Sequence, residues 1–241
     1  AKELSWCKPK LSKDPSVLRI VQGRHPLVEV TALTHGRFVP NNTDLGSHGT
    51  PARRVQVLTG ANLAGKSVYL KQVGIIVYLA QIGSFVPAQE AEIGLCDFLF
   101  SRIHSKESAT VGCSSFGIDL TQVCHALNNA TCASLLLLDE FGKGTHAADG
   151  VALFGATIAH LCGLQDGPKA IATTHFTEIF RFGIVKETLT GLHLSSMRVL
   201  PPEEGHGEIA YLYQVVDGVA DRSFGVECAR LAGVEESVVA R

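Results

Sequence analysis

The chain alternates between two apolar patterns, one typical of buried strands and the other of helices. Short apolar runs at 55–59 and 169–175 predict strands, and so does SLLLLDE at 134–140. This last run is uninterrupted and ends in two acids, which is typical of a strand buried on both faces of a sheet. Two longer stretches, 15–22 and 91–103, also have strand character.

Segments with helical spacing separate these runs. Apolar residues recur at steps of three and four at Leu70, Val73, Val77 and Ala80, and again at Phe116, Leu120, Val123, Leu127 and Ala130. The small-residue segment 150–163 predicts a third helix. Because helices and strands alternate, we predict an α/β fold with a mostly parallel central sheet flanked by helices on both sides. We expect residues 23–30 to be extended after a turn, and residues 34–54 to be loop.

The composition is that of a globular domain, since 46% of the 241 residues are hydrophobic and 18% are charged. A formal net charge of −2 gives no sign of a nucleic-acid surface in this stretch, because phosphate binding needs clustered Lys and Arg. No apolar run approaches the roughly 20 residues of a membrane span, and the N-terminus lacks signal-peptide form, so we expect no membrane partner. Neither end of the chain carries a distinct terminal segment, and we therefore expect a fragment of a longer protein.

Seven cysteines, at positions 7, 96, 113, 124, 132, 162 and 228, form no C-x-x-C pair and no metal-ligand spacing with histidine. Their number is odd, which argues against a complete set of disulfides. We interpret them as buried thiols in a protein of a reducing compartment.

The residues GANLAGKS at 60–67 match the phosphate-loop pattern G-x-x-x-x-G-K-[ST], between a predicted strand and a predicted helix. Glycines let the backbone curl so that N–H groups point inward, and the helix adds the positive end of its dipole. Lys66 would reach the β- and γ-phosphates of a nucleotide, and the Ser67 hydroxyl would bind Mg²⁺. The alternative is an ordinary glycine-rich turn with a surface lysine. The cofactor-binding candidates are Gly60, Ala61, Asn62, Leu63, Ala64, Gly65, Lys66, Ser67 and Val68.

A phosphate loop requires a metal-directing acid at the tip of a neighbouring strand. Asp139 follows the leucine run and is therefore the candidate metal ligand, together with Ser67. Glu140 could orient a water for attack on the γ-phosphate as a general base. His175 ends another strand-like run and could hydrogen-bond the γ-phosphate, and Gln81 could bridge the metal or water and the sheet. The alternatives are a solvated strand end and a structural histidine.

Two further stretches have no role within a single site. CSSFGIDL at 113–120 starts a predicted helix with two serines, whose hydroxyl and N–H groups favour an anion. FGKGTHAADG at 141–150 follows the two acids and contains three glycines. A helix tip that favours phosphate, on a domain already holding a nucleotide, suggests that it caps the nucleotide of a partner subunit. An ordinary N-capped helix is the alternative.

In this order and spacing, the segments resemble the ATPase domain of the MutS family. The matching pieces include GRHPLVE, RFVPNNT, TGANLAGKS, FSRIHSKES, LLLLDEFGKGT and ATTHF, and the tail YLYQVVDGVADRSFGVECARLAGVEESVVAR. The resemblance covers nearly the whole chain. RIHSKES, IDLTQV, NNAT and GKG, where most of the family has G-R-G, make the chain most similar to the fifth eukaryotic homologue, in the meiotic branch.

The resemblance implies a P-loop NTPase of the ABC-ATPase type that binds ATP and Mg²⁺ and works as a dimer with two composite sites. Glu140 and His175 would be catalytic, Ser114 would reach the partner's nucleotide in trans, and Phe38 would stack on adenine. The ATPase domain with its N-terminal lead-in would span 1–205. A truncated C-terminal strand and helix-turn-helix dimerisation element would follow at 206–241, with Ser223 and Gly225 in its SFG turn.

The resemblance further implies a partner subunit, the fourth homologue, and a nuclear location on meiotic chromosomes. DNA would bind through regions outside this chain, and ATP would close the dimer on recombination intermediates in crossover formation. We expect an Mg-dependent ATPase that is weak as an isolated domain. The alternatives are a nucleotide-dependent dimerisation module with little ATPase activity, a mismatch-repair homologue, and a transporter-type ABC ATPase, which the absence of L-S-G-G-Q disfavours.

Three positions depart from the family pattern. Ala61 stands where the family usually has proline, and Val68 where many members have threonine. Gly117 replaces a bulky apolar residue and would loosen the helix that starts near Ser114, because glycine costs roughly 1 kcal/mol in a helix relative to alanine. None of the three removes a phosphate or metal ligand.

Overall fold

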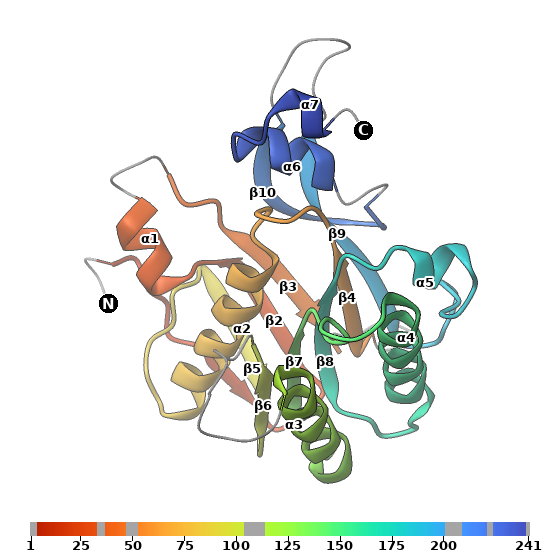
Figure 1. The fold of residues 1–241 in the computed structure, drawn as a ribbon. Coiled ribbons are helices and arrows are strands. Elements are labelled where there is room, and N and C mark those ends of the chain that lie inside the picture. Colours follow the sequence, from red (N-terminus) through yellow and green to blue (C-terminus); the bar gives the residue numbers. More distant parts are fainter. Residues whose placement is uncertain are drawn as a thin grey trace.

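A computed structural model describes residues 4–32, 37–46, 53–103, 114–200, 209–220 and 224–239 of the protein. Its centre is a six-stranded sheet in the order β10-β9-β4-β8-β7-β6 (Figure 1). In that order the strands are Ala210–Asp217, Leu192–Leu200, Val55–Thr59, Lys169–Thr174, Leu135–Asp139 and Leu99–Arg102. Neighbouring strands are parallel except for β10, which is antiparallel to β9. The prediction of a mostly parallel central sheet is confirmed.

Helices cover both faces of this sheet. Helix α2 (Lys66–Gln81) lies on one face, and α3 (Ser115–Asn129), α4 (Ala147–Gly163) and the short α5 (Glu178–Arg181) lie on the other. Strand β7 divides its leucines between the two cores: Leu135 and Leu137 pack with α2, while Leu136 and Leu138 pack with α3 and α4. The prediction of a strand buried on both faces is confirmed. No helix in the described part of the chain is long and apolar enough to cross a membrane.

A second sheet, which we did not predict, packs against α2. Its order is β1-β5-β2-β3, with the bounds Lys10–Ser12, Glu90–Gly94, Leu18–Gly23 and Asn41–Leu45. Strand β2 is antiparallel to both of its neighbours, and β1 is parallel to β5. Strand β3 lies in the segment predicted as loop, because its sequence NNTDL is polar at four of five positions. Pairing with β2, rather than local apolar alternation, makes it a strand.

Residues 26–32 form a helix, α1 (Pro26–Ala32), although we predicted extended chain at 23–30. Proline is well accommodated at the first position of a helix, where its missing N–H would have no partner. His25 supplies the cap: its Nδ1 accepts a hydrogen bond from Val28 N at 3.3 Å, and its carbonyl accepts one from Glu29 N at 2.9 Å. The valines in this segment have strand propensity, but the cap and the proline outweigh it.

The C-terminal segment adds β10 to the central sheet and then forms two short helices, α6 (Gly225–Leu231) and α7 (Glu236–Val239). Two helices joined by a turn lie where the helix-turn-helix was expected, and Gly225 starts α6. The role of this element in dimerisation stays a prediction. Ser223 and the predicted domain boundary at 205 lie outside the described residues. The two helices and their turn expose apolar side chains at Val226, Leu231, Val234 and Val238.

The cysteines are free wherever the structure describes them, but most are not buried. Of the six described cysteines, Cys162 is buried, Cys124 and Cys132 are exposed, and the others are intermediate. The expectation of buried thiols is therefore wrong for the exposed pair. Cys113 lies outside the described residues.

Candidate active site

Residues 60–65 connect the buried strand β4 to α2 in a curled loop. The backbone φ angle is +146° at Gly60 and +98° at Gly65, values that side-chain-bearing residues rarely adopt. A Cβ atom at Gly60 would also lie 3.1 Å from Met197 Cβ. Leu63, at φ +66°, points outward and is 73% exposed. The loop N–H groups and the N-terminus of α2 therefore form a cradle suited to an anion.

Lys66, the first residue of α2, is 5% exposed and turns back over the loop. Its Nζ donates hydrogen bonds to Gly60 O at 2.8 Å and Ala61 O at 2.9 Å. The same atom lies 3.6 Å from Oε1 of Glu140. Burial lowers the pKa of the ammonium group, although the Glu140 carboxylate opposes that shift. The alternative of a glycine-rich turn with a surface lysine is therefore wrong.

The C-terminal segment supports the loop from outside. Within the loop, Ala61 and Ala64 are buried, whereas Asn62 is exposed and its carbonyl lies 3.8 Å from the thiol of Cys228 on α6. At the start of the loop, the Thr59 hydroxyl accepts a hydrogen bond from Ala220 N at 2.8 Å. Contacts with the C-terminal segment therefore hold both the start of the loop, at Thr59, and its middle, at Asn62.

Asp139 ends strand β7 and is 5% exposed, so the alternative of a solvated strand end is wrong. Its Oδ1 accepts a hydrogen bond from the Thr173 hydroxyl at 2.6 Å, and its charge acts on the Lys66 ammonium, which places the carboxylate beside the loop. Ser67 is half-buried in the first turn of α2. Hydroxyl and carboxylate oxygens are the ligands that Mg²⁺ prefers, so this pair fits the ion. Among the described residues there is no cluster of three or more His, Cys, Asp or Glu that could hold a metal.

Glu140 follows Asp139 in a left-handed backbone conformation, with φ +50°. Its carboxylate pairs with Lys143 Nζ at 2.5 Å, and His175 Nδ1 lies 4.0 Å from its other oxygen. Burial alone would raise the pKa of this carboxyl, but Lys143, Lys66 and His175 together lower it below the ordinary value. Glu140 is therefore ionised at neutral pH and faces the phosphate loop.

His175 directly follows β8, and its side chain is three-quarters buried. Burial lowers the pKa of the imidazole more than the nearby Glu140 raises it, so the ring is neutral at pH 7. Its Nδ1 has no hydrogen-bond partner among the described residues. The ring packs against Phe176 with centroids 4.5 Å apart. His175 is thus placed near the loop with a polar atom free for a ligand.

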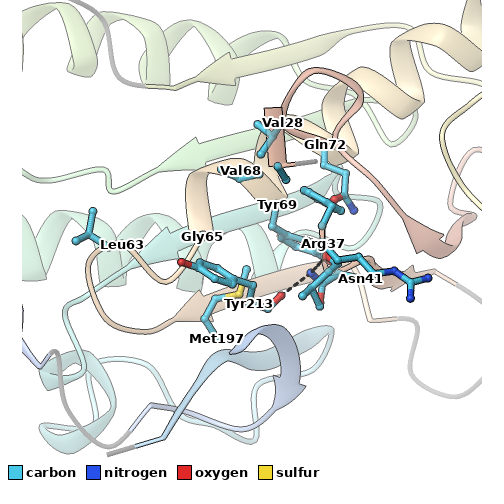
Figure 2. A pocket seen from close by; sticks show the side chains of 13 residues that line it. Val28, Arg37, Asn41, Leu63, Gly65, Val68, Tyr69, Gln72, Met197 and Tyr213 are labelled. Carbon is cyan, nitrogen blue, oxygen red and sulfur yellow. Dashed lines mark hydrogen bonds between the residues drawn. The ribbon is translucent and has the colours of Figure 1, made fainter. Parts of the chain in front are cut away.

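A cavity of about 380 Å³ opens beside the phosphate loop (Figure 2). This volume lies within the range of roughly 300–1,000 Å³ typical of small-molecule pockets. Phe38, the candidate for stacking on adenine, and Val68, the last residue of the predicted phosphate-binding set, both line the cavity. On another wall, Tyr213 from β10 lies beside Gly65, with Met197 from β9 next to it. The walls are mainly apolar, which suits the faces of a planar ring.

Sequence reasoning missed Tyr213. It sits at an irregularity in the pairing of β10 with β9, with φ +55°. The Asn41 side chain holds this bulge: its amide nitrogen donates to Tyr213 O at 2.9 Å (Figure 2). Its amide oxygen accepts a hydrogen bond from Val215 N at 2.7 Å. Alternating tyrosines in YLYQVV were the available signal, but they fit a plain strand equally well. The bulge redirects Tyr213 toward the cavity, and sequence alone does not show it.

Gln81 does not belong to the site, and its prediction is wrong. It is the last residue of α2, about 22 Å along the helix axis from Lys66 at 1.5 Å per residue. Its amide donates to Gly94 O at 3.1 Å and accepts from Cys96 N at 3.3 Å. Gln81 therefore fastens the far end of α2 to the last residue of β5 and to the segment that follows it.

Ser114 caps helix α3 and is exposed. Its Oγ accepts a hydrogen bond from Gly117 N at 3.1 Å, which confirms the N-capped helix. The helix continues through Gly117, so the glycine does not interrupt it. The contact of Ser114 with a partner's nucleotide stays a prediction.

Comparisons with known proteins show the family to which the chain belongs. The family model described as MutS domain V matches residues 56–241. The chain is 40% identical to the DNA mismatch repair protein MutS of Lawsonia intracellularis over 98% of its length, and 38% identical to MutS protein homolog 5 of Saccharomyces cerevisiae over 99%. It spans 25% and 28% of these two relatives, respectively. MutS domain V is an ATPase domain, and this chain belongs to that family.

Proposed function

We propose that this domain binds ATP with Mg²⁺ and hydrolyses it, with Glu140 as the general base. One observation carries the proposal: three ionisable side chains from different elements meet beside the phosphate loop. Lys66 and His175 lie 3.6 Å and 4.0 Å from the same oxygen of Glu140. Burying such groups together is costly unless they pair or serve a function, so their convergence supports an active site.

The loop and Lys66 would hold the triphosphate. The Lys66 ammonium, which now donates to two loop carbonyls, would exchange them for phosphate oxygens, because hydrogen bonds between charged groups are stronger. Ser67 and Asp139 would hold Mg²⁺, which would supply positive charge to offset the negative charge that develops on the phosphates. The adenine would enter the cavity lined by Phe38 and Tyr213.

Glu140 would accept the proton of the attacking water. Its lowered pKa keeps the carboxylate ionised at neutral pH, as a proton acceptor must be. Lys143 donates a hydrogen bond to one of the two carboxylate oxygens of Glu140, so Glu140 has its full basicity only after Lys143 has moved away. His175 would donate a ring N–H to the γ-phosphate and so sense its presence.

Replacing the base tests this assignment. Glu140→Gln keeps the size of the side chain but removes its basicity, so it should retain Mg·ATP binding and slow single-turnover hydrolysis at least about tenfold. Glu187→Gln is the matched control, because that carboxylate is exposed on the surface and its loss should leave the rate unchanged. A Glu140→Gln rate equal to that of the wild type would refute the role of Glu140. A wild type that binds Mg·ATP without turnover would instead support a nucleotide-dependent dimerisation module.

A second MutS-family subunit would complete the site. Ser114 at the exposed start of α3 would reach the partner's nucleotide, and the apolar side chains exposed on α6 and α7 would contribute to the dimer interface. We favour the fourth homologue as the partner in a heterodimer, as the meiotic motifs imply. Sedimentation of the protein with and without that homologue and ATP tests the pairing, and a protein that stays monomeric throughout would contradict it.

Which DNA structure the protein binds depends on the branch of the family to which it belongs. We favour clamping of recombination intermediates in the nucleus, on meiotic chromosomes, because the motifs RIHSKES and GKG match that branch and a yeast MutS protein homolog 5 is 38% identical. A mismatch-repair role is the second candidate, since a bacterial MutS is 40% identical. Binding of the assembled protein to a four-way junction and to a mismatched duplex separates the two. Tighter binding to the mismatch would contradict the meiotic role.

A further inference from the structure

One peptide group, between Asp139 and Glu140, is held from both of its polar ends. Its N–H donates to the carbonyl and the hydroxyl of Thr173, both at 3.1 Å. Its C=O accepts a hydrogen bond from the guanidinium of Arg102, on the neighbouring edge strand β6. Glu140 has a φ angle of +50°, which a residue with a side chain keeps only where its surroundings impose it. The two clamps on the preceding peptide supply that constraint.

Arg102 also reaches a second element. Its other terminal nitrogen pairs with Oδ2 of Asp119, in the second turn of α3. Both side chains are 5% exposed, so water does not screen this contact. The planar guanidinium has a rigid fork of donors, which fixes the position of Asp119 relative to the carbonyl of Asp139. Helix α3 and the peptide that carries the metal ligand and the base are therefore joined through one side chain.

We propose that Arg102 is a positioning residue that couples the placement of the N-terminal part of helix α3 to the orientation of the Asp139–Glu140 peptide. The inference rests on the proposed function, because it concerns the same base. Ser114 caps the exposed start of α3, only five residues before Asp119. A partner subunit that shifts this end of the helix shifts the guanidinium, and the guanidinium turns the peptide. The direction of the Glu140 carboxylate changes with it.

If Arg102 had only a structural role, its substitution would change Mg·ATP binding and hydrolysis in a different pattern. Arg102→Lys keeps the charge but replaces the fork with a single ammonium, which cannot hold both oxygens in the same geometry. We expect this variant, assayed with a second MutS-family subunit, to bind Mg·ATP within about twofold of the wild type and to hydrolyse it at least about tenfold more slowly. A structural role would weaken binding and hydrolysis together.

A double variant sharpens the test. If Arg102 acts through Glu140, adding Arg102→Lys to Glu140→Gln should slow hydrolysis by less than about twofold further, because the positioned group has already lost its function. Independent roles would multiply the two losses. Arg54→Lys is the matched control: both terminal nitrogens of Arg54 also donate hydrogen bonds, here to the main-chain carbonyls of Gly167 and Leu164 at the opposite end of the sheet, and its variant should keep the wild-type rate.

If Arg102→Lys does not fold, Asp119→Asn provides the test. It keeps an acceptor for Arg102 but removes the charge, and we expect it to lose most of the acceleration caused by the partner while retaining the partner-free rate. Multiplicative losses in the double variant, or an Asp119→Asn protein accelerated as strongly as the wild type, would overturn the proposal. A wild type without any turnover in the same assay would refute the proposed function itself, so the two failures are distinguishable.

Discussion

Substituting Gly150 should impair hydrolysis without unfolding the domain. Gly150 lies in the first turn of α4, in backbone contact with Gly142 in the loop that follows Glu140. A Cβ atom at Gly150 would lie 2.2 Å from Gly142 O and 3.1 Å from Gly142 C. Backbone atoms cannot rotate away as a side chain can, so the two segments must separate by about 1 Å. That movement carries Lys143 and Glu140 with it.

The expected magnitudes follow from this displacement. Overpacking typically costs about 1–3 kcal/mol, whereas alanine in place of glycine in a helix contributes about 0.5–1 kcal/mol of stability. The net loss of roughly 0–2.5 kcal/mol should lower the Tm by less than about 10 °C in a domain of this size. A misplacement of about 1 Å at a catalytic group can cost about a hundredfold in rate, so we expect hydrolysis to fall by tenfold or more.

The assay is single-turnover hydrolysis of Mg·ATP by Gly150→Ala, combined with calorimetric ATP binding and thermal unfolding. Affinity should stay within about threefold, because the change does not touch the phosphate loop. Gly163→Ala in the same helix is the control, since a Cβ there would meet no atom within 4 Å. The reasoning would be refuted if Gly150→Ala hydrolysed ATP at the wild-type rate, or if the control lost as much activity.

Three further predictions concern single side chains around the site. Lys143→Met removes the cation paired with Glu140, so the pKa of that carboxyl should rise and the acid limb of the pH–rate profile should move to higher pH; an unmoved limb would contradict the pairing. Tyr213→Ala should weaken ATP binding roughly 5- to 150-fold in calorimetry, because stacking of a base on an aromatic ring contributes about 1–3 kcal/mol, whereas Tyr213→Phe should bind normally. Equal affinities would place the base elsewhere. Burial lowers the pKa of His175, so below about pH 6.5 the imidazole takes up a proton in the unfolded chain more readily than in the folded protein. The free energy of unfolding therefore decreases as the pH is lowered. His175→Gln should reduce that fall between pH 7 and 5 in urea unfolding, and an unchanged slope would exclude the buried imidazole as its cause.

The central strands and the phosphate loop could be predicted because their signals are local. Strands β4, β7 and β8 are buried on both faces, which requires the short apolar runs seen in the sequence. The loop depends on glycines at fixed spacing, and Gly60 and Gly65 indeed have positive φ angles. Asp139 and Glu140 could be predicted as site residues because they directly follow one such apolar run.

The rest depends on contacts between residues distant in the sequence. Strand β3 is polar and exists through its pairing with β2. Thr173 reaches Asp139 because the register of β7 with β8 sets the two residues side by side. Arg102 and Tyr213 act through an edge strand and a bulge, which leave no local pattern. Gln81 lies outside the site because α2 runs for 16 residues and carries its last residue away from the phosphate loop.

Mg·ATP binding by Lys66 variants tests the central claim most directly. Isothermal titration calorimetry of the folded wild type should show one site per chain, and Lys66→Met should weaken Mg·ATP binding by roughly 10- to 150-fold, because a charge-assisted hydrogen bond contributes about 1.5–3 kcal/mol. Lys186→Met, at an exposed position, is the control and should bind as the wild type does. A wild type that takes up no Mg·ATP, or a Lys66→Met protein of undiminished affinity, would contradict the account.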